Sequence, residues 1–451
     1  MTTAMTHRKH VRAILTLGLP LIGGHLAQMA IGVTDTVMLG WYSIEALAAG
    51  VLGSTFFFVL FIFGSGFGMA VMPLVAAYDA EDDEIGLRRA TRMGLWLSIG
   101  FAMIALPVMI WSKPVLSLLG QEPELAALGG RYLSIAGWGI VPALLVMVLK
   151  SYLAALERTQ VVLWITLGAA IVNALANYAL IFGNWGAPEL GVMGAAIASV
   201  TTHTVSLIGI VVYVLIALPQ HSLFVRLWRV DPQMLLRVFR LGLPIGLTTL
   251  SEVGLFAASS LMMGWISTFA LAAHGIAIQL VSLVFMVHLG LSNVATIRVG
   301  NAFGRRDAPH MARGAWIVIV LSVVFSLLTM IGFIGWPEAL ISLFMQESEP
   351  ARLEIIAIGT GLLVMATLFQ LVDGAQVVAL GLLRGAQDTQ VPMIMAAVSY
   401  WGVGVPCSYL LGFTFGYGAL GVWAGLVAGL ALAAVLLNAR FWGQTIRRLN
   451  F

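Results

Sequence analysis

The sequence predicts an all-α integral membrane protein with twelve transmembrane helices in two pseudo-symmetric six-helix lobes. Its composition is 60% hydrophobic and only 10% charged, and the mean hydropathy is +0.99. Long apolar runs recur over the whole length, and the second half of the chain repeats the first. A water-soluble globule needs far more charge on its surface, so lipid is the expected solvent.

Each apolar run is long enough to cross a hydrocarbon core of about 30 Å at about 1.5 Å per residue. The first run is too long for the apolar core of a signal peptide, and we expect it to be retained as a span. The twelve expected spans are residues 13–38, 46–78, 90–112, 128–150, 160–183, 191–218, 238–263, 270–299, 313–335, 354–380, 391–414 and 418–441.

An internal repeat organises the chain. Residues 17–40 and 241–264 both open with Leu-Gly-Leu-Pro and close with Met-x-Gly, at a constant offset of 224 residues (241 − 17). The match continues without a gap to Asp83 and Asp307. Internal repeats of this kind are typical of membrane transporters. We therefore expect an N-terminal lobe over residues 1–218, a cytoplasmic linker over 219–237 and a C-terminal lobe over 238–451.

The basic residues predict the orientation of the chain in the membrane. Of the 23 Lys and Arg residues, only Lys113, Arg131 and Arg352 fall on one side of the expected spans. Basic residues concentrate in cytoplasmic loops, which places both termini in the cytoplasm. The net charge of +3 thus indicates topology, and no nucleic-acid partner is expected. The linker mixes basic and apolar residues, as interfacial segments do.

Three carboxylates lie inside expected spans: Asp35, Glu252 and Asp373. A carboxylate at the centre of a span costs about 2.5 to 3.5 kcal/mol on insertion scales, and such residues usually face a cavity and bind or relay ions. The alternative is a carboxylate held only by structural hydrogen bonds.

Glu252 and Asp373 should lie at the same depth. Glu252 is 12 residues from Arg240 (252 − 240), and Asp373 is 11 residues from Arg384 (384 − 373), or about 17 to 18 Å along straight helices. Two like charges facing one cavity repel each other unless a cation lies between them. The pair is therefore a candidate site for a proton or for Na⁺, the latter being the one metal expected.

Asp35 is expected nearer the outer side. Asn173 and Asn177 are one helical turn apart on the fifth span, and their amide oxygens could complete a cation shell with Asp35; equally, such a pair could simply join helices. Ser199 on the sixth span is a weaker candidate for this cluster. Gln28, the neutral counterpart of Glu252 (252 − 224), and Phe369, one turn before Asp373, are weak candidates for substrate binding, the latter through cation–π contact.

Enzyme motifs are absent from the sequence. There is no Walker A sequence, no His-Glu-x-x-His pair and no nucleophile elbow, so the chain is expected to be no enzyme and to need no cofactor beyond a coupling ion. The single cysteine, Cys407, lies in an apolar run and permits no intramolecular disulfide.

Together, the repeated Leu-Gly-Leu-Pro, Thr34-Asp35, Pro73, the Asn173 and Asn177 pair, and Glu252 with Asp373 resemble the multidrug and toxic compound extrusion (MATE) family, over essentially the whole chain. Glu252 and Asp373 resemble its NorM-type branch. The resemblance implies a V-shaped pair of lobes, alternating access, and export of cationic or zwitterionic drugs and dyes in exchange for Na⁺ or H⁺.

The resemblance also implies residue roles: Glu252 and Asp373 for cation coupling in the C-lobe, and Asp35 with Asn173 and Asn177 in the N-lobe. Phe369 departs from the Tyr that NorM-type proteins commonly have, which removes a hydroxyl and leaves ring stacking. We expect a monomer surrounded by lipid in a bacterial inner membrane, contributing to antibiotic resistance.

Two other functions fit a twelve-span architecture. A lipid or lipid-linked glycan flippase would need cavity arginines to hold phosphates, whereas every Arg here falls at a span end or in a loop. A passive channel would need a ring of repeated charges, whereas three isolated carboxylates are present.

Overall fold

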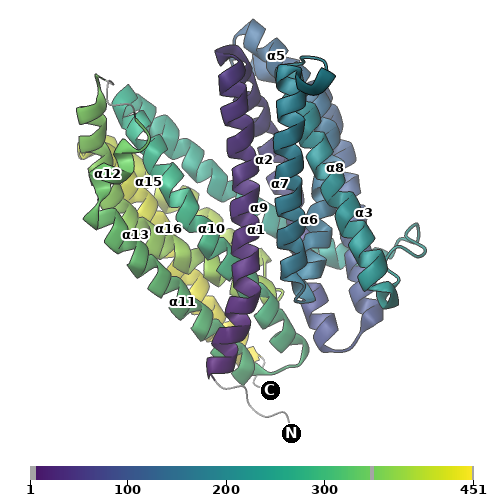
Figure 1. Cartoon of the computed structure of the whole chain (residues 1–451). Coiled ribbons are helices and arrows are strands. Elements are labelled where there is room, and N and C mark those ends of the chain that lie inside the picture. The colour runs from purple at the N-terminus through teal and green to yellow at the C-terminus, as the bar shows by residue number, and fades with distance from the viewer. Residues whose placement is uncertain (1–6, 346–349, 449–451) are drawn as a thin grey trace. The chain divides into compact units, whose positions relative to one another are not determined.

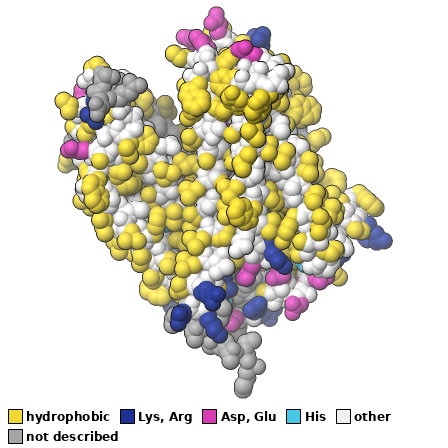
Figure 2. All heavy atoms as spheres, viewed as in Figure 1, with side chains coloured by type: hydrophobic (Ala, Val, Ile, Leu, Met, Phe, Trp, Pro, Cys, Tyr) yellow, Lys and Arg dark blue, Asp and Glu magenta, His cyan; other side chains and the backbone are white. Residues whose placement is uncertain are grey.

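The computed structural model describes residues 7–345 and 350–448, and this part of the chain is helical with no strand. Twelve helical stretches in it are long and apolar enough to cross a membrane, which confirms the expected fold class. On the face seen in Figure 2, hydrophobic side chains cover the sides of the helices, and charged side chains gather near their ends.

The spans of the first repeat are α1 (His7–Tyr42), α2 (Ile44–Ala80), α3 (Glu84–Ile110), α5 (Pro123–Ala136) continued by η1 (Gly137–Gly139) and α6 (Ile140–Ala155), α7 (Thr159–Phe182) and α8 (Val192–Ala217). The spans of the second repeat are α9 (Pro232–Ile266), α10 (Thr268–Gly304), α11 (Ala308–Gly335), α13 (Arg352–Gly385), α14 (Gln390–Ala397) continued by η4 (Val398–Gly404), α15 (Val405–Tyr409) and η5 (Leu410–Thr414), and α16 (Gly418–Arg440) continued by η6 (Phe441–Thr445). Short helices α4 (Ser112–Leu118), η2 (Asn184–Gly186), η3 (Pro219–His221), α12 (Pro337–Ser342) and α17 (Ile446–Arg448) complete the described chain.

The repeat extends to the helix caps. The Ser43 side chain accepts a hydrogen bond from Ala46 N at 3.0 Å, and Ser267, 224 residues later, accepts from Ala270 N at the same distance. Asp83 and Asp307 cap α3 and α11 in the same way, each at 2.9 Å. Both repeats thus begin their helices with the same N-cap chemistry.

The contacts divide the chain into two units at positions that differ from the expected lobe boundaries. Unit 1 contains Met1–Gly18 and Leu247–Phe451, and unit 2 contains Leu19–Gly246. The division falls inside α1 and α9, within or just after the repeated Leu-Gly-Leu-Pro, whereas the sequence suggested a boundary in the linker. The first turns of each of these two helices pack with the spans of the other repeat.

In unit 2, the first half of α9 packs on α2 and α3. Met234 and Val238 of α9 share a buried cluster with Leu74 of α2 and Met93 of α3. A Cβ added to Gly66 would lie only 2.5 Å from the Gly242 carbonyl oxygen, so α2 and α9 approach backbone to backbone. Elsewhere in this unit, α7 and α8 pack side by side (Figure 1).

In unit 1, α13 packs against α10, α11 and α16. The α10–α13 contact is joined by side-chain-to-backbone hydrogen bonds: Ser292 Oγ donates to the Val377 carbonyl at 2.6 Å, and Thr296 Oγ1 donates to the Gly381 carbonyl at 2.9 Å. A Cβ at Gly381 would clash with the backbone and side chain of Ser292. Small residues that admit a neighbouring helix are a general device for packing in membranes.

We expect Gly381→Ala to lower the free energy of unfolding by about 1 to 3 kcal/mol, because the added methyl group meets backbone that has no room to move. The measurement is thermal unfolding of the purified protein in detergent. Gly332→Ala on α11 is the matched control, since no atom lies within 4 Å of its added Cβ. Equal stability of the two variants would contradict this account of the α10–α13 contact.

Candidate functional site

Glu252 and Asp373 meet inside unit 1 through a shared amide. Gln376 Nε2 donates to Glu252 Oε1 at 2.7 Å and to Asp373 Oδ1 at 3.3 Å. Tyr400 OH donates in turn to Gln376 Oε1 at 2.7 Å. All four side chains are buried. The structure therefore brings together the two carboxylates that the sequence placed at one depth, and joins them in one hydrogen-bond network.

Local helix geometry explains how these side chains converge. Asp373 and Gln376 are three residues apart on α13 and so lie on one face of that helix. Tyr400 lies in the π-helical segment η4, and π-helical turns within longer helices frequently occur at functional sites because they re-aim side chains. Glu252 reaches the same point from α9.

Arg384 adds positive charge to this network. It is the penultimate residue of α13, at the span end where the sequence placed it, but its side chain is buried with 8% exposed. It interacts electrostatically with Glu252 and Tyr400. The charge of Glu252 is thus balanced in part from within its own unit.

An aromatic layer lies next to the carboxylates. The Phe369 ring lies between Phe256 and Trp423, with centroid distances of 5.9 and 5.4 Å. Phe369 has no exposed surface, so in this conformation its ring packs in the unit and is not open to a ligand.

Trp423 is itself held by a histidine. Its Nε1 donates to His274 Nδ1 at 3.0 Å, and Ser260 Oγ lies 3.1 Å from His274 Nε2. An indole N–H only donates, so His274 Nδ1 is an acceptor and carries no proton. The layer is therefore fixed by a neutral imidazole.

A second polar cluster surrounds Asp35 in unit 2. Asp35 Oδ1 accepts from Asn173 Nδ2 at 3.0 Å and from Asn177 Nδ2 at 2.5 Å. Ser199 also interacts with the Asp35 carboxylate, and its hydroxyl donates to the Ala195 carbonyl at 3.0 Å. Tyr132 of α5 interacts with both Asp35 and Ser199. Four helices, α1, α5, α7 and α8, thus converge on one carboxylate.

One acceptor oxygen of the Asp35 cluster is left without a hydrogen bond. Asn177 is fully buried, yet its Oδ1 has no hydrogen-bond partner. Carboxylate, amide and hydroxyl oxygens are the ligands that hard cations prefer, so the donor set fits a small cation. Gln28, by contrast, is exposed and forms part of neither cluster.

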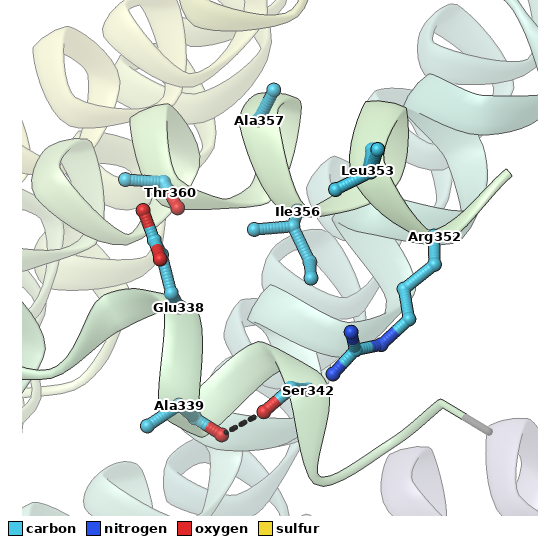
Figure 3. A pocket seen from close by; sticks show the side chains of 8 residues that line it. All are labelled: Glu338, Ala339, Ser342, Arg352, Leu353, Ile356, Ala357 and Thr360. Atoms are coloured by element: carbon cyan, nitrogen blue, oxygen red, sulfur yellow. Dashed lines mark hydrogen bonds between the residues drawn. The ribbon is translucent and has the colours of Figure 1, made fainter. Parts of the chain in front are cut away.

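The described residues contain no group of three or more His, Cys, Asp or Glu side chains placed to hold a metal ion. An open pocket of unit 1, lined by residues of α12 and α13, lies elsewhere: Glu338 and Thr360 point toward each other across it, and Arg352 points toward Ser342 (Figure 3). None of the expected site residues lines this pocket.

Three residues of the clusters were not predicted from the sequence: Gln376, Tyr400 and Tyr132. Gln376 had a usable signal, because it is a polar residue three positions after an intramembrane Asp. The two tyrosines had none, since tyrosine is common in membrane helices and only the packing of separate helices brings these two to a carboxylate.

Comparison with known proteins places the chain in a well-populated group. The MatE family model matches residues 20–179 and 244–410. The "Probable multidrug resistance protein NorM" of Agrobacterium fabrum is 45% identical over 96% of this chain and 93% of its own length. The protein of that name from Rhizobium meliloti is 44% identical over 98% and 95%. The crystal structure of the eukaryotic MATE transporter AtDTX14 matches with a TM-score of 0.85 and 17% identity, covering 98% of each chain, which supports the fold.

We expect Tyr400→Phe to lower the free energy of unfolding by about 1 kcal/mol, because it leaves the buried Gln376 carbonyl without its donor. Gln376→Leu should cost more, and the double variant should cost less than the sum of the two by at least about 0.5 kcal/mol, as expected of residues in one network. Denaturant unfolding in detergent measures all three. Tyr409→Phe, which alters an exposed tyrosine nearby, should change nothing, and strictly additive effects would refute the network.

Proposed function

This chain belongs to the MatE family, and from that premise we propose that it is a secondary multidrug exporter that expels organic cations and zwitterions in exchange for Na⁺ or H⁺. It is a multi-pass membrane transporter rather than an enzyme. The names of its relatives, probable multidrug resistance proteins, support drugs and dyes as the substrate class.

The observation that carries the proposal is the shared amide of Gln376 between Glu252 and Asp373. One N–H₂ group holds both carboxylates in place without neutralising them. Two like charges so close together attract a cation strongly in a medium of low dielectric. A proton or Na⁺ bound there, with the Gln376 and Tyr400 oxygens close by, would relieve the repulsion.

The same charges attract a cationic drug, and this provides the coupling. When the ion occupies Glu252 and Asp373, the negative charge that holds the drug is reduced, so ion and drug favour different states of one equilibrium. A ligand shifts such an equilibrium only by its difference in affinity for the two states. Alternating access then exchanges one cation for the other across the membrane.

Asp35 supplies a second coupling site in the N-lobe, with Asn173, Asn177 and Ser199. The unpartnered Asn177 Oδ1 is the oxygen that we assign to the cation. The concentration of Lys and Arg on one side of the spans supports a cytoplasmic location of both termini, and we assign the protein to a bacterial inner membrane. We further propose that the protein acts as a monomer in lipid, and that it contributes to antibiotic resistance.

We expect purified protein in liposomes to export a fluorescent organic cation in response to one of two gradients, Na⁺ or pH, when each is imposed separately. Export should saturate with substrate. If only the Na⁺ gradient drives export, a metal ion is assigned to Glu252 and Asp373; if only the pH gradient does, protons are assigned to the carboxylates. Export that responds to neither gradient would contradict antiport and favour a lipid or lipid-linked glycan flippase.

We expect Asp373→Asn to reduce gradient-driven export to the level of empty liposomes, because the variant keeps the side-chain volume and loses the charge. Asp35→Asn should impair coupling in the same assay. Asp388→Asn is the control, since Asp388 pairs with Arg440 in a partly exposed ion pair, at 2.6 Å, and should export normally. Wild-type export by Asp373→Asn, with equal amounts of folded protein in the liposomes, would refute the assignment.

A further inference from the structure

The segment between α8 and α9 is an ordered loop fixed to the side of α3. Arg92 Nε donates to the Leu223 carbonyl, and Arg92 Nη2 donates to the Ser222 carbonyl, both at 2.7 Å. Trp96 Nε1 donates to the Leu227 carbonyl at 2.8 Å. Left-handed backbone at Ser222 and Arg226 turns the chain.

The end of this loop is fixed by charge. Asp231 forms an ion pair with Arg89 and caps α9 by accepting from Met234 N at 3.1 Å. The hydrogen bond from Arg89 holds the pKa of Asp231 below its ordinary value, so the carboxylate stays ionised at neutral pH. The Asp231 backbone N–H also contacts the Met93 sulfur.

These anchors fix the level at which the loop lies. Arg89, Arg92 and Trp96 lie within eight residues of α3, which is about two helical turns on one face. The loop therefore runs alongside the first turns of α3 rather than beyond the end of the helix. Figure 1 shows a loop projecting at the side of the helices of this unit.

The outward side of the loop combines apolar and basic residues. Val225 and Trp228 are 58% and 76% exposed, while Leu223 on the inward side is buried. Arg226 and Arg229 are exposed beside them. On the edge of unit 2 seen in Figure 2, Lys or Arg side chains stand next to hydrophobic ones.

Open loop backbone is excluded from the hydrocarbon region, because lipid tails satisfy no N–H or C=O group. Exposed Trp beside Arg is instead the composition of the headgroup level, where the indole lies among the headgroups and the guanidinium meets phosphate. Three further arginines, Arg88, Arg89 and Arg92, lie on the same turns of α3. Arg89 is paired with Asp231, so Arg88 and Arg92 are the two that add positive charge at this level.

From these contacts we infer that the α8–α9 loop is a binding surface for anionic phospholipid, in which Arg226 and Arg229 hold the phosphate headgroup and Trp228 with Val225 enters the interface. The partner is a membrane lipid with net negative charge, such as phosphatidylglycerol. This inference is independent of the drug and of the coupling ion, because none of the loop residues belongs to the carboxylate clusters.

Native mass spectrometry of the purified full-length protein tests the inference. The protein in mild detergent is titrated separately with phosphatidylglycerol and with phosphatidylcholine, and bound lipids are counted. Each basic residue near an anionic lipid contributes about a fivefold preference. The variant Arg226→Gln/Arg229→Gln should therefore lose the preference for phosphatidylglycerol by about fivefold for each arginine. Arg158→Gln, an exposed arginine in another loop of the same unit, should keep it.

A second measurement reports the position of the loop. In a Cys407→Ser background, a spin label at Trp228→Cys in phosphatidylglycerol nanodiscs should be more accessible to oxygen than to a water-soluble nickel complex. The same label at Glu81→Cys, in the exposed α2–α3 turn, should show the opposite. An unchanged lipid preference in the double variant, or a label at 228 as exposed to nickel as the control, would overturn the inference. A label shielded only after a second protein is added would also overturn it, in favour of a protein partner.

Discussion

The structure depends on one constraint: an ionisable side chain inside a membrane-spanning helix needs hydrogen-bond partners from its own or neighbouring helices, because lipid supplies none. Glu252 and Asp373 accept hydrogen bonds from the Gln376 amide, and Asp35 accepts hydrogen bonds from the amides of Asn173 and Asn177. These donors are neutral, so they orient the carboxylates without cancelling their charge. The one fixed cation described beside the Glu252 network, Arg384, interacts with Glu252 and balances its charge only in part. Neutral amide donors therefore fit the ion-binding role that we propose for both clusters.

The two repeats share a scaffold and differ in chemistry. Their N-caps match at Ser43 and Ser267 and again at Asp83 and Asp307, so the helices begin alike. The counterpart of Glu252 is the exposed Gln28, and the counterpart of Asp35 (35 + 224) is Ser259, which donates to the Phe256 carbonyl of its own helix. Charge is costly in lipid, and in each repeat the intramembrane carboxylates accept hydrogen bonds from buried amides.

The division of α1 and α9 between the two units has a structural consequence. The first turns of α9 contribute Met234, Val238 and Ile245 to a core built on α2 and α3. Similarly, residues 7–18 of α1 belong with the unit that holds α10 and α11, where Arg298 lies 2.9 Å from His310 and 3.4 Å from His10. Each unit thus contains helix turns from the other repeat. In both helices, the boundary between the two units lies within or just after the Leu-Gly-Leu-Pro motif.

Much of this protein is determined by its sequence alone, because lipid allows few solutions. Apolar length predicts twelve spans, the constant offset predicts the repeat, and intramembrane charge selects Asp35, Glu252 and Asp373. The pairing of Asn173 with Asn177 follows from helical spacing, and Asp35, the partner that the sequence suggested for both, accepts a hydrogen bond from each amide in the structure. Other features required the tertiary structure: Gln376 as the bridge, Tyr400 and Tyr132 beside the carboxylates, the enclosure of Phe369, and the unit boundaries inside α1 and α9. Periodicity along one helix shows which side chains share a face, but only the packing of separate helices decides which faces meet.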